Sequence, residues 1–262
     1  MPSIFALPPF IGNAAAGDFV HVGDKSDQLD KAATYDQLFK MQLGSGANSL
    51  NQSEGSGDAT NTFSMATGGN ATSSGNNSRA HGDTVTASGD YSDGQGHNVT
   101  ASGQAAHAGG QRSVARRFCE WARSAFRFAA NGDAQIGMFH ASNQTVDAVP
   151  TPLFLDGTGA TQGIDLADNS AIVVHALVTA RHTGANEAAG YRLSVLVRRD
   201  VGAGTTAIVG AQEKVVLGED DAAWDANLVA NAVFGGVGIL VTGAGGKTIN
   251  WSAKLDTSEI VT

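Results

Sequence analysis

Side chains that could do chemistry are few in this sequence and widely spaced. Three histidines, His81, His97 and His107, lie in a stretch rich in glycine, serine and asparagine, and carboxylates cluster once, at residues 219–221. Imidazole and carboxylate groups are common metal ligands. Counted from the preceding glycine of a seven-residue repeat, the histidines occupy three different positions. We therefore expect them not to share one face and not to hold a metal. The acidic cluster could ligate calcium, but a solvated loop is favoured.

Sequence motifs for catalysis or cofactor binding are missing. The chain has no G-x-S-x-G, no H-E-x-x-H and no P-loop, and the glycines in 238–246 follow a strand with no helix after it, so a dinucleotide has no helix N-terminus to bind. A glycan depolymerase would show paired carboxylates in a longer β-helix; the repeat offers only Asp83, Asp90 and Asp93. We predict that the protein is not an enzyme and uses no cofactor. Cys119 and His175 are expected to be buried, the latter in a core or an interface.

Composition excludes other classes. The net charge is −9, which disfavours a nucleic-acid partner, and charged residues make up only 16% of the chain while glycine contributes 34 of its 262 residues. Few charges and many glycines are typical of a turn-rich β protein. No run approaches eighteen apolar residues, and the N-terminus has no signal-peptide pattern, so neither membrane insertion nor secretion is expected.

The three histidines lie in an internal repeat between residues 75 and 115, which must position their side chains. Its glycines are Gly75, Gly82, Gly89, Gly96, Gly103 and Gly110. Five residues after each glycine stand Ala80, Ala87, Gly94, Ala101, Ala108 and Ala115. Three residues after each glycine stand Ser78, Val85, Ser92, Val99, Ala106 and Ser113. The repeat therefore places small side chains at two fixed positions.

A seven-residue period usually indicates a coiled coil, but here it predicts a solenoid of short strands. Glycine in every heptad costs a helix about 1 kcal/mol each time, with no apolar seam in compensation. Glycine suits the corners of a solenoid, where φ is positive or backbones approach closely. Because strand side chains alternate, positions 3 and 5 share a face. We expect that face of small residues to be the core of a homotrimer. The alternative is a disordered linker.

The unit Gly75-Asn-Asn-Ser78-Arg-Ala80-His81 resembles the head repeats of trimeric autotransporter adhesins. Bacteriophage fibre proteins carry similar repeats. The resemblance implies that two units form one turn of a left-handed β-roll and that three chains pack side by side. Six units would rise only about 15 Å at strand spacing, which describes a short stem.

Residues 1–42 are predicted to form a β-α leader. A strand is expected at residues 18–22, then a turn, then a helix that begins with a capping box. The residues that indicate this helix are Thr34, Tyr35, Gln37, Leu38 and Met41. Residues 15–42 are similar to a short module near the N-terminus of phage tail-fibre proteins. That resemblance implies attachment to a virion tail or capsid protein, or initiation of the trimer.

Two segments flank the repeat. Residues 43–74 are predicted to be a linker or an extended segment, although Gly68 keeps the heptad phase, so the repeat could begin there. Residues 116–135 bring four aromatic residues and four arginines together and complete a domain of residues 75–135. We expect a strand with Ala122, Ser124, Phe126 and Phe128 on one face, forming a trimeric neck. The alternative is a basic aromatic site for an anionic glycan.

Residues 136–262 show alternating strands at the spacing of a β-sandwich or jelly roll. Inward-facing sets are expected at Tyr191, Leu193, Val195 and Val197, and at Ile249, Trp251, Ala253 and Leu255. Segments such as "DNSAIVVHALVTARHT" and "VTGAGGKTINWSAKL" make this region similar to a C-terminal module of phage structural and tail-fibre proteins. The resemblance implies a projecting knob and supplies no catalytic residues.

Together these observations predict an all-β protein of the virion, assembled in the host cytoplasm. The expected function is that of a homotrimeric phage tail fibre or short spike that contributes to host attachment, with a host surface glycan or protein as a further partner. Alternatives are a head fibre or capsid decoration protein, an enzyme that degrades host surface glycan, and a cellular adhesin.

Overall fold

The computed structural model describes residues 19–22, 31–34, 42–46, 49–54, 57–157, 159 and 163–262. In this part of the chain the structure is all-β, as predicted, with one 3-10 turn at Ala203–Thr205 and no α-helix. The described residues thus contain no helix long and apolar enough to cross a membrane. The chain divides into residues 1–42 and residues 43–262.

The N-terminal unit contains one antiparallel strand pair, β1 (Phe19–Val22) with β2 (Lys31–Thr34). Thr34, expected to cap a helix, is the last residue of β2. The other predicted helix residues, Tyr35, Gln37, Leu38 and Met41, lie outside the described residues.

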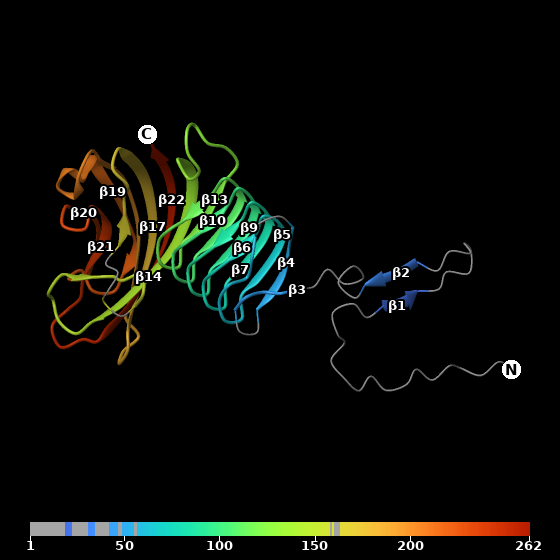
Figure 1. The fold of residues 1–262 in the computed structure, drawn as a ribbon. Helices are drawn as coiled ribbons and strands as arrows, with labels where there is room; N and C mark the ends of the chain where they lie inside the picture. The colour runs from blue at the N-terminus through green and yellow to red at the C-terminus, as the bar shows by residue number, and fades with distance from the viewer. Residues whose placement is uncertain are drawn as a thin grey trace. The chain divides into compact units, whose positions relative to one another are not determined.

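The described residues between 43 and 124 wind into a solenoid, seen as stacked strands in Figure 1. One side is a sheet formed by β3 (Gln42–Leu43), β4 (Leu50–Glu54), β5 (Met65–Gly69), β7 (Arg79–Asp83), β9 (Asp93–His97), β11 (His107–Gln111) and β13 (Trp121–Ser124). The other side consists of β6 (Thr72–Ser73), β8 (Thr86–Ala87), β10 (Thr100–Ala101) and β12 (Val114–Ala115). From β5 onward, paired residues on each side are fourteen positions apart, as in Arg79 with Asp93. One turn therefore contains two heptads, and turns already form before Gly75.

Small residues fill the interior of a single chain. Ala80, Ala87, Ala101, Ala108 and Ala115 are completely buried, together with the predicted position-3 residues. The two sheets of one chain close over these side chains, so their small size does not require other chains. The predicted trimer needs separate support.

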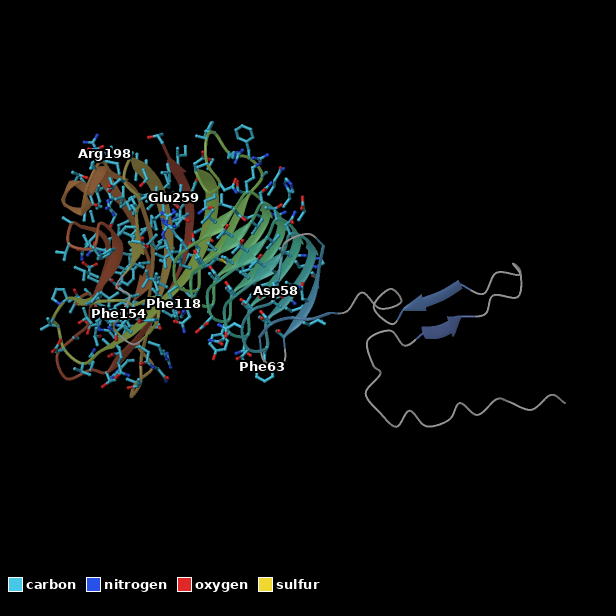
Figure 2. The ribbon with its side chains drawn as sticks, viewed as in Figure 1. Asp58, Phe63, Phe118, Phe154, Arg198 and Glu259 are labelled. Atoms are coloured by element: carbon cyan, nitrogen blue, oxygen red, sulfur yellow. The ribbon has the colours of Figure 1, made fainter. Side chains whose placement is uncertain are left out.

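Backbone geometry at the corners differs from the prediction in one respect. Gly82, Gly96 and Gly110 have positive φ, but Gly75, Gly89 and Gly103 do not. Instead, a non-glycine residue two positions after each repeat glycine is left-handed, from Asn77 to Arg112. Such residues donate their backbone N–H to a carbonyl fifteen residues earlier, as Asn98 does to Asp83 and Arg112 to His97. Their side chains point outward, as Phe63 does in Figure 2.

The solenoid sheet continues into the C-terminal region without a break. Five antiparallel strands extend it in the order β14 (Ala134–Thr145), β22 (Ile249–Val261), β17 (Ser170–His182), β18 (Ala188–Arg199) and β19 (Ala207–Glu219). A smaller sheet consists of β15 (Thr151–Pro152), β16 (Ile164–Asp165), β20 (Asp225–Asn231) and β21 (Gly236–Thr242). One twelve-stranded sheet thus runs from β3 of the solenoid to β19 of the C-terminal region.

A hydrophobic core lies between these two sheets, and both predicted inward-facing sets are buried in it. Tyr191 stacks on Trp251, whose indole N–H donates to the Thr145 hydroxyl. His175, predicted to lie in a core or an interface, is instead exposed on β17. Side chains of β17 point alternately to the two faces of the sheet, and only the inner face is covered. The nearly all-apolar sequence of this strand therefore did not mean that both of its faces are buried.

Close packing between turns makes the solenoid sensitive to added atoms. A Cβ on Gly96, where φ is +134°, would fall on the carbonyl oxygen of Gly110. We expect Gly96→Ala to lower the free energy of unfolding by at least about 3 kcal/mol, because a strained φ and a backbone clash add. A Cβ on Gly109 would meet only the His107 ring, at 3.5 Å. Gly109→Ala is therefore the control, and thermal unfolding of both variants is the measurement. Equal loss in the two variants would contradict this account of the packing.

Candidate functional site

The outer face of the solenoid sheet carries a ladder of functional side chains. Arg79, Asp93, His107 and Trp121 lie on β7, β9, β11 and β13, and each is paired in register with the next. Arg79 binds Asp93 through two N–H groups, at 3.0 and 2.7 Å. The carboxylate oxygen that accepts the shorter of these bonds, Oδ2, also lies 3.1 Å from His107 Nδ1. The His107 ring packs against Trp121 edge to face, with centroids 4.9 Å apart. Four side chains from four turns thus form one continuous row.

Electrostatics favour the charged forms of Arg79 and Asp93. Burial raises the pKa of Asp93, but the hydrogen bond and charge of Arg79, helped by His107, more than offset this and lower it below its usual value. The same hydrogen bond and the charge of Asp93 raise the pKa of Arg79. Asp93 is therefore a fixed acceptor that orients both neighbours.

A cavity of about 270 Å³ opens on this face beside the ladder. Its walls are Met65, Arg79, His81, Asp93 and Gln95. His81 Nδ1 lies 2.7 Å from the Thr67 hydroxyl on the neighbouring strand. Donors and acceptors that converge on a small cavity are suited to a ligand rich in hydroxyl groups.

The prediction that the histidines do not share a face is wrong. His81, His97 and His107 lie on β7, β9 and β11, at positions that alternate with the buried residues of those strands. The heptad was the wrong unit, because positions must be compared over a turn of fourteen residues. Even so, no group of three or more possible metal-ligating side chains occurs in the described part of the chain.

The basic aromatic segment 116–135 is divided by the fold into three environments. Arg117 is buried, Trp121 is 53% exposed on the outer face, and Phe128 is 71% exposed. β13 ends at Ser124, so the predicted strand face is correct for Ala122 and Ser124 and wrong for Phe126 and Phe128. Cys119, expected to be buried, is exposed at a corner.

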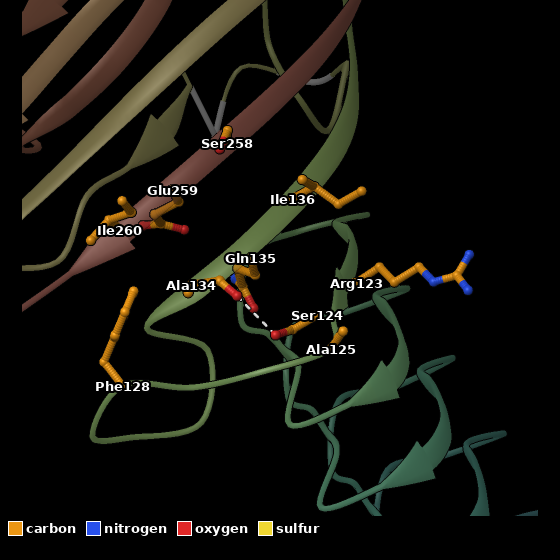
Figure 3. A pocket seen from close by; sticks show the side chains of 10 residues that line it. All are labelled: Arg123, Ser124, Ala125, Phe128, Ala134, Gln135, Ile136, Ser258, Glu259 and Ile260. Carbon is orange, nitrogen blue, oxygen red and sulfur yellow. Dashed lines mark hydrogen bonds between the residues drawn. The ribbon is translucent and has the colours of Figure 1, made fainter.

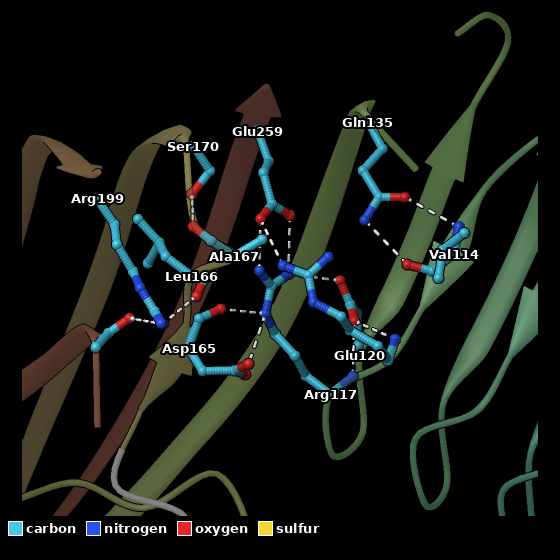
Figure 4. A network of polar contacts seen from close by, with 12 residues as sticks. Val114, Arg117, Glu120, Gln135, Asp165, Leu166, Ala167, Ser170, Arg199 and Glu259 are labelled. Atoms are coloured by element: carbon cyan, nitrogen blue, oxygen red, sulfur yellow. Dashed lines mark hydrogen bonds and ion pairs between the residues drawn. The ribbon is translucent and has the colours of Figure 1, made fainter. Parts of the chain in front are cut away.

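The buried arginine belongs to a network that joins the last solenoid turn to β22 (Figure 4). Arg117 donates to both oxygens of Glu259, at 2.9 and 2.6 Å, and to Glu120 at 3.0 Å. Arg116 donates to Glu259 at 2.9 Å, and the Arg117 Nε–H donates to the carbonyl of Asp165. The Asp165 carboxylate also lies 3.4 Å from Arg117, and the side chains of Arg117, Glu120 and Glu259 are buried. The network is structural.

Burial and the neighbouring charges shift the pKa values of Glu259 and Glu120 in opposite directions. Burial raises the pKa of Glu259, and the charges of Arg117 and Arg116 outweigh that effect, so the pKa lies below its usual value. Burial also raises the pKa of Glu120, and Arg117 offsets it only in part, since the charge of Glu259 acts in the same direction as burial. Glu259 is therefore the ionised partner on which the network depends.

This balance predicts a pH-dependent mutational effect. At neutral pH, Glu259→Gln is expected to lower the free energy of unfolding by about 3–5 kcal/mol, because it leaves a buried arginine uncompensated. Since the folded-state pKa of Glu259 is lowered, its stabilising contribution is present above the unfolded-state pKa. That contribution is lost as the pH falls through the folded-state pKa.

The difference between wild type and Glu259→Gln should therefore shrink in acid. Chemical unfolding at neutral and acidic pH measures it. Glu213→Gln is the control, because Glu213 faces Arg192 at 3.7 Å on the exposed surface. A difference that stays constant with pH would contradict the assignment.

A second cavity, of about 460 Å³, lies where the loop after β13 approaches β14 and β22 (Figure 3). Its lining is mainly apolar and includes Phe128, Ile136 and Ile260, all well exposed. The Ser124 hydroxyl, at one side, donates to the carbonyl of Ala134 at 2.8 Å. Arg123 and Glu259 also line this cavity, but the Glu259 carboxylate is bound by Arg116 and Arg117.

The acidic cluster is occupied by protein partners. Asp221 accepts from Lys247 at 2.7 Å, Asp220 accepts the backbone N–H of Ala188, and Glu219 accepts the Tyr191 hydroxyl. The hydrogen bonds to Lys247 and Ala223 lower the pKa of Asp221. The three carboxylates thus serve three separate contacts, and calcium is not needed to explain them.

Comparison with known proteins gives only distant likenesses. No protein-family model and no curated protein sequence matches the chain. Among solved structures, it is similar to a tailspike protein of the Acinetobacter baumannii bacteriophage Fri1, a capsular polysaccharide depolymerase, with 10% identity and a TM-score of 0.30 over 76% of this chain and 36% of that one. The tailspike of Acinetobacter baumannii phage AM24 gives 9% identity and a TM-score of 0.27 over 76% of this chain and 42% of that one.

A third structure, the tailspike of Acinetobacter phage vB_ApiP_P1, gives 8% identity and a TM-score of 0.19. It covers 79% of this chain and 53% of that one. The chain thus spans from about a third to about half of the length of these tailspikes.

The prediction that the chain is not an enzyme is contradicted by this comparison, since the Fri1 tailspike is itself described as a depolymerase. The prediction relied on short motifs and on carboxylates close together in sequence. In a solenoid, side chains fourteen residues apart are neighbours, as Asp93 and His107 are. A site assembled in this way has no short motif, so the missing motifs exclude little.

Proposed function

We propose that the protein is a bacteriophage fibre or spike that attaches the virion to a glycan of the host surface. The observation that carries this proposal is the ladder from Arg79 to Trp121 on an exposed, regular sheet. An exposed indole can stack on a sugar ring, because the ring face is electron-rich and sugar C–H groups are electropositive. The charged and polar neighbours, fixed by each other at 2.7–3.1 Å, offer partners for hydroxyl groups.

A homotrimer is part of this proposal. The family resemblance of the repeat supports it, and so does the exposed apolar surface around Phe128, Ile136 and Ile260. Three copies would triple the number of weak glycan sites and increase the avidity. The N-terminal unit is the proposed attachment to a tail or capsid protein, and the C-terminal region is the proposed knob.

Adsorption to cells tests the glycan-binding face. Trp121→Ala in the full chain is expected to reduce binding of the labelled protein to host cells at least about fivefold, because stacking on an aromatic ring contributes about 1–3 kcal/mol. Phe126→Ala, which removes another exposed aromatic residue, is the control and should bind normally. Normal adsorption of Trp121→Ala would remove the ladder from the proposal.

The oligomeric state is tested separately. Sedimentation and electrophoresis without boiling should show an SDS-resistant trimer, and a monomer would contradict that part of the proposal. Immunogold labelling of virions distinguishes a tail position from a head fibre or a capsid decoration.

Glycan cleavage is the second candidate function. It is favoured by the pair of Asp93 and His107, in which the carboxylate fixes the orientation of the imidazole, as in sites where histidine transfers a proton. Incubation of the protein with purified host polysaccharide, followed by size-exclusion chromatography, tests this activity. Chain shortening that is lost in His107→Gln would support it, and unchanged chain length would contradict it.

A further inference from the structure

We infer that the solenoid face contains a subsite for a carboxylate-bearing sugar, formed by His107, Trp121 and Arg123 above Gly109. This inference rests on the proposed function and specifies the class of glycan that the face binds.

The floor of the subsite is a position without a side chain. In the row next to the ladder, Gln95, Gly109 and Arg123 are paired in register on β9, β11 and β13. A Cβ added at Gly109 would contact only His107 Nε2, at 3.5 Å. The row therefore has a gap at Gly109, between the side chains of Gln95 and Arg123. His107 and Trp121 of the ladder lie next to this gap.

One imidazole nitrogen faces this gap. His107 Nδ1 is engaged by Asp93 at 3.1 Å, and the short approach to the Gly109 position shows that Nε2 points toward the floor. Asp93 is in turn neutralised by Arg79. The imidazole is thus held in one orientation, with its free nitrogen available to a ligand.

Arg123 supplies an uncommitted positive charge. Its side chain extends away from Glu259 in Figure 3 and is exposed. Among the residues that the structure describes, Arg123 forms no ion pair, whereas Arg79, Arg116 and Arg117 all bind carboxylates. A guanidinium group binds a carboxylate through two parallel hydrogen bonds.

Trp121 completes the subsite. Trp121 and Arg123 are two residues apart on one strand, so they lie on the same face, roughly 7 Å apart. A ring stacked on the exposed indole could therefore present a carboxylate to Arg123 and a hydroxyl to His107 Nε2. A neutral sugar would leave the guanidinium group without a partner.

Titration calorimetry with defined glycans tests the inference. The probes are hexasaccharides of hyaluronan, alginate and polysialic acid, together with the same oligosaccharides after reduction of their carboxylates to alcohols. At least one acidic probe should bind the full chain, and its reduced form should bind at least about tenfold more weakly, the loss expected for a charge-assisted hydrogen bond.

Substitutions at two positions, Arg123 and Gly109, localise the binding. Arg123→Gln should weaken the acidic probe about tenfold, and Arg123→Lys should restore part of the loss. Gly109→Val should abolish binding by filling the floor, with unchanged thermal unfolding. Arg198→Gln is the matched control, because Arg198 is exposed on β18 of the same sheet.

The outcomes separate this inference from the proposed function. If no acidic probe binds, if the reduced probes bind equally well, or if Arg123→Gln binds normally, the acidic subsite is overturned. Adsorption to host cells that persists in those cases leaves the proposed function intact. Failure of the wild-type protein to adsorb to any host cell would overturn the proposed function itself.

Discussion

The structure depends on the register of backbone hydrogen bonds between successive fourteen-residue turns. Each turn is hydrogen-bonded to the next along both sides and at the corners, where left-handed residues such as Asn98 donate to the turn before. This constraint leaves little space between turns, so alanine, serine and two valines, Val85 and Val99, fill the interior. It also brings Arg79, Asp93, His107 and Trp121 into one row, although they are spread over forty-three residues of sequence.

The end of the solenoid is tied to the C-terminal region in two ways. Main-chain pairing of β13 with β14 makes the sheet continuous, and the salt-bridge network of Arg117 and Glu259 lies against that junction. Buried ion pairs contribute little net stability but penalise any arrangement that separates the partners. The network therefore favours one orientation of the last solenoid turn, which carries Trp121, against β22.

The sequence predicted the elements whose signals are local. Alternation identified the inward faces around Tyr191 and Trp251, and the glycine period identified the solenoid. The left-handed corners were missed because glycine was assumed to occupy them, although asparagine at residues 70, 77 and 98 was a usable signal, since asparagine tolerates positive φ. The ladder was missed because residues were compared over seven positions in place of fourteen. The partnership of Arg117 with Glu259 has no local signal, since 142 residues separate them.

The fourteen-residue turn also restricts how such a chain can change in length. Insertion of two heptads adds one strand to each side and lengthens the stem by one strand spacing, about 4.8 Å, while every outer side chain keeps its sheet. Insertion of a single heptad would leave the small residues inside but transfer all later outer residues to the opposite sheet, which would divide the row of Arg79 and Trp121. The solenoid can therefore change in length only by whole turns without dividing this row. In-frame duplications of forty-two nucleotides, three for each residue of a turn, meet that condition.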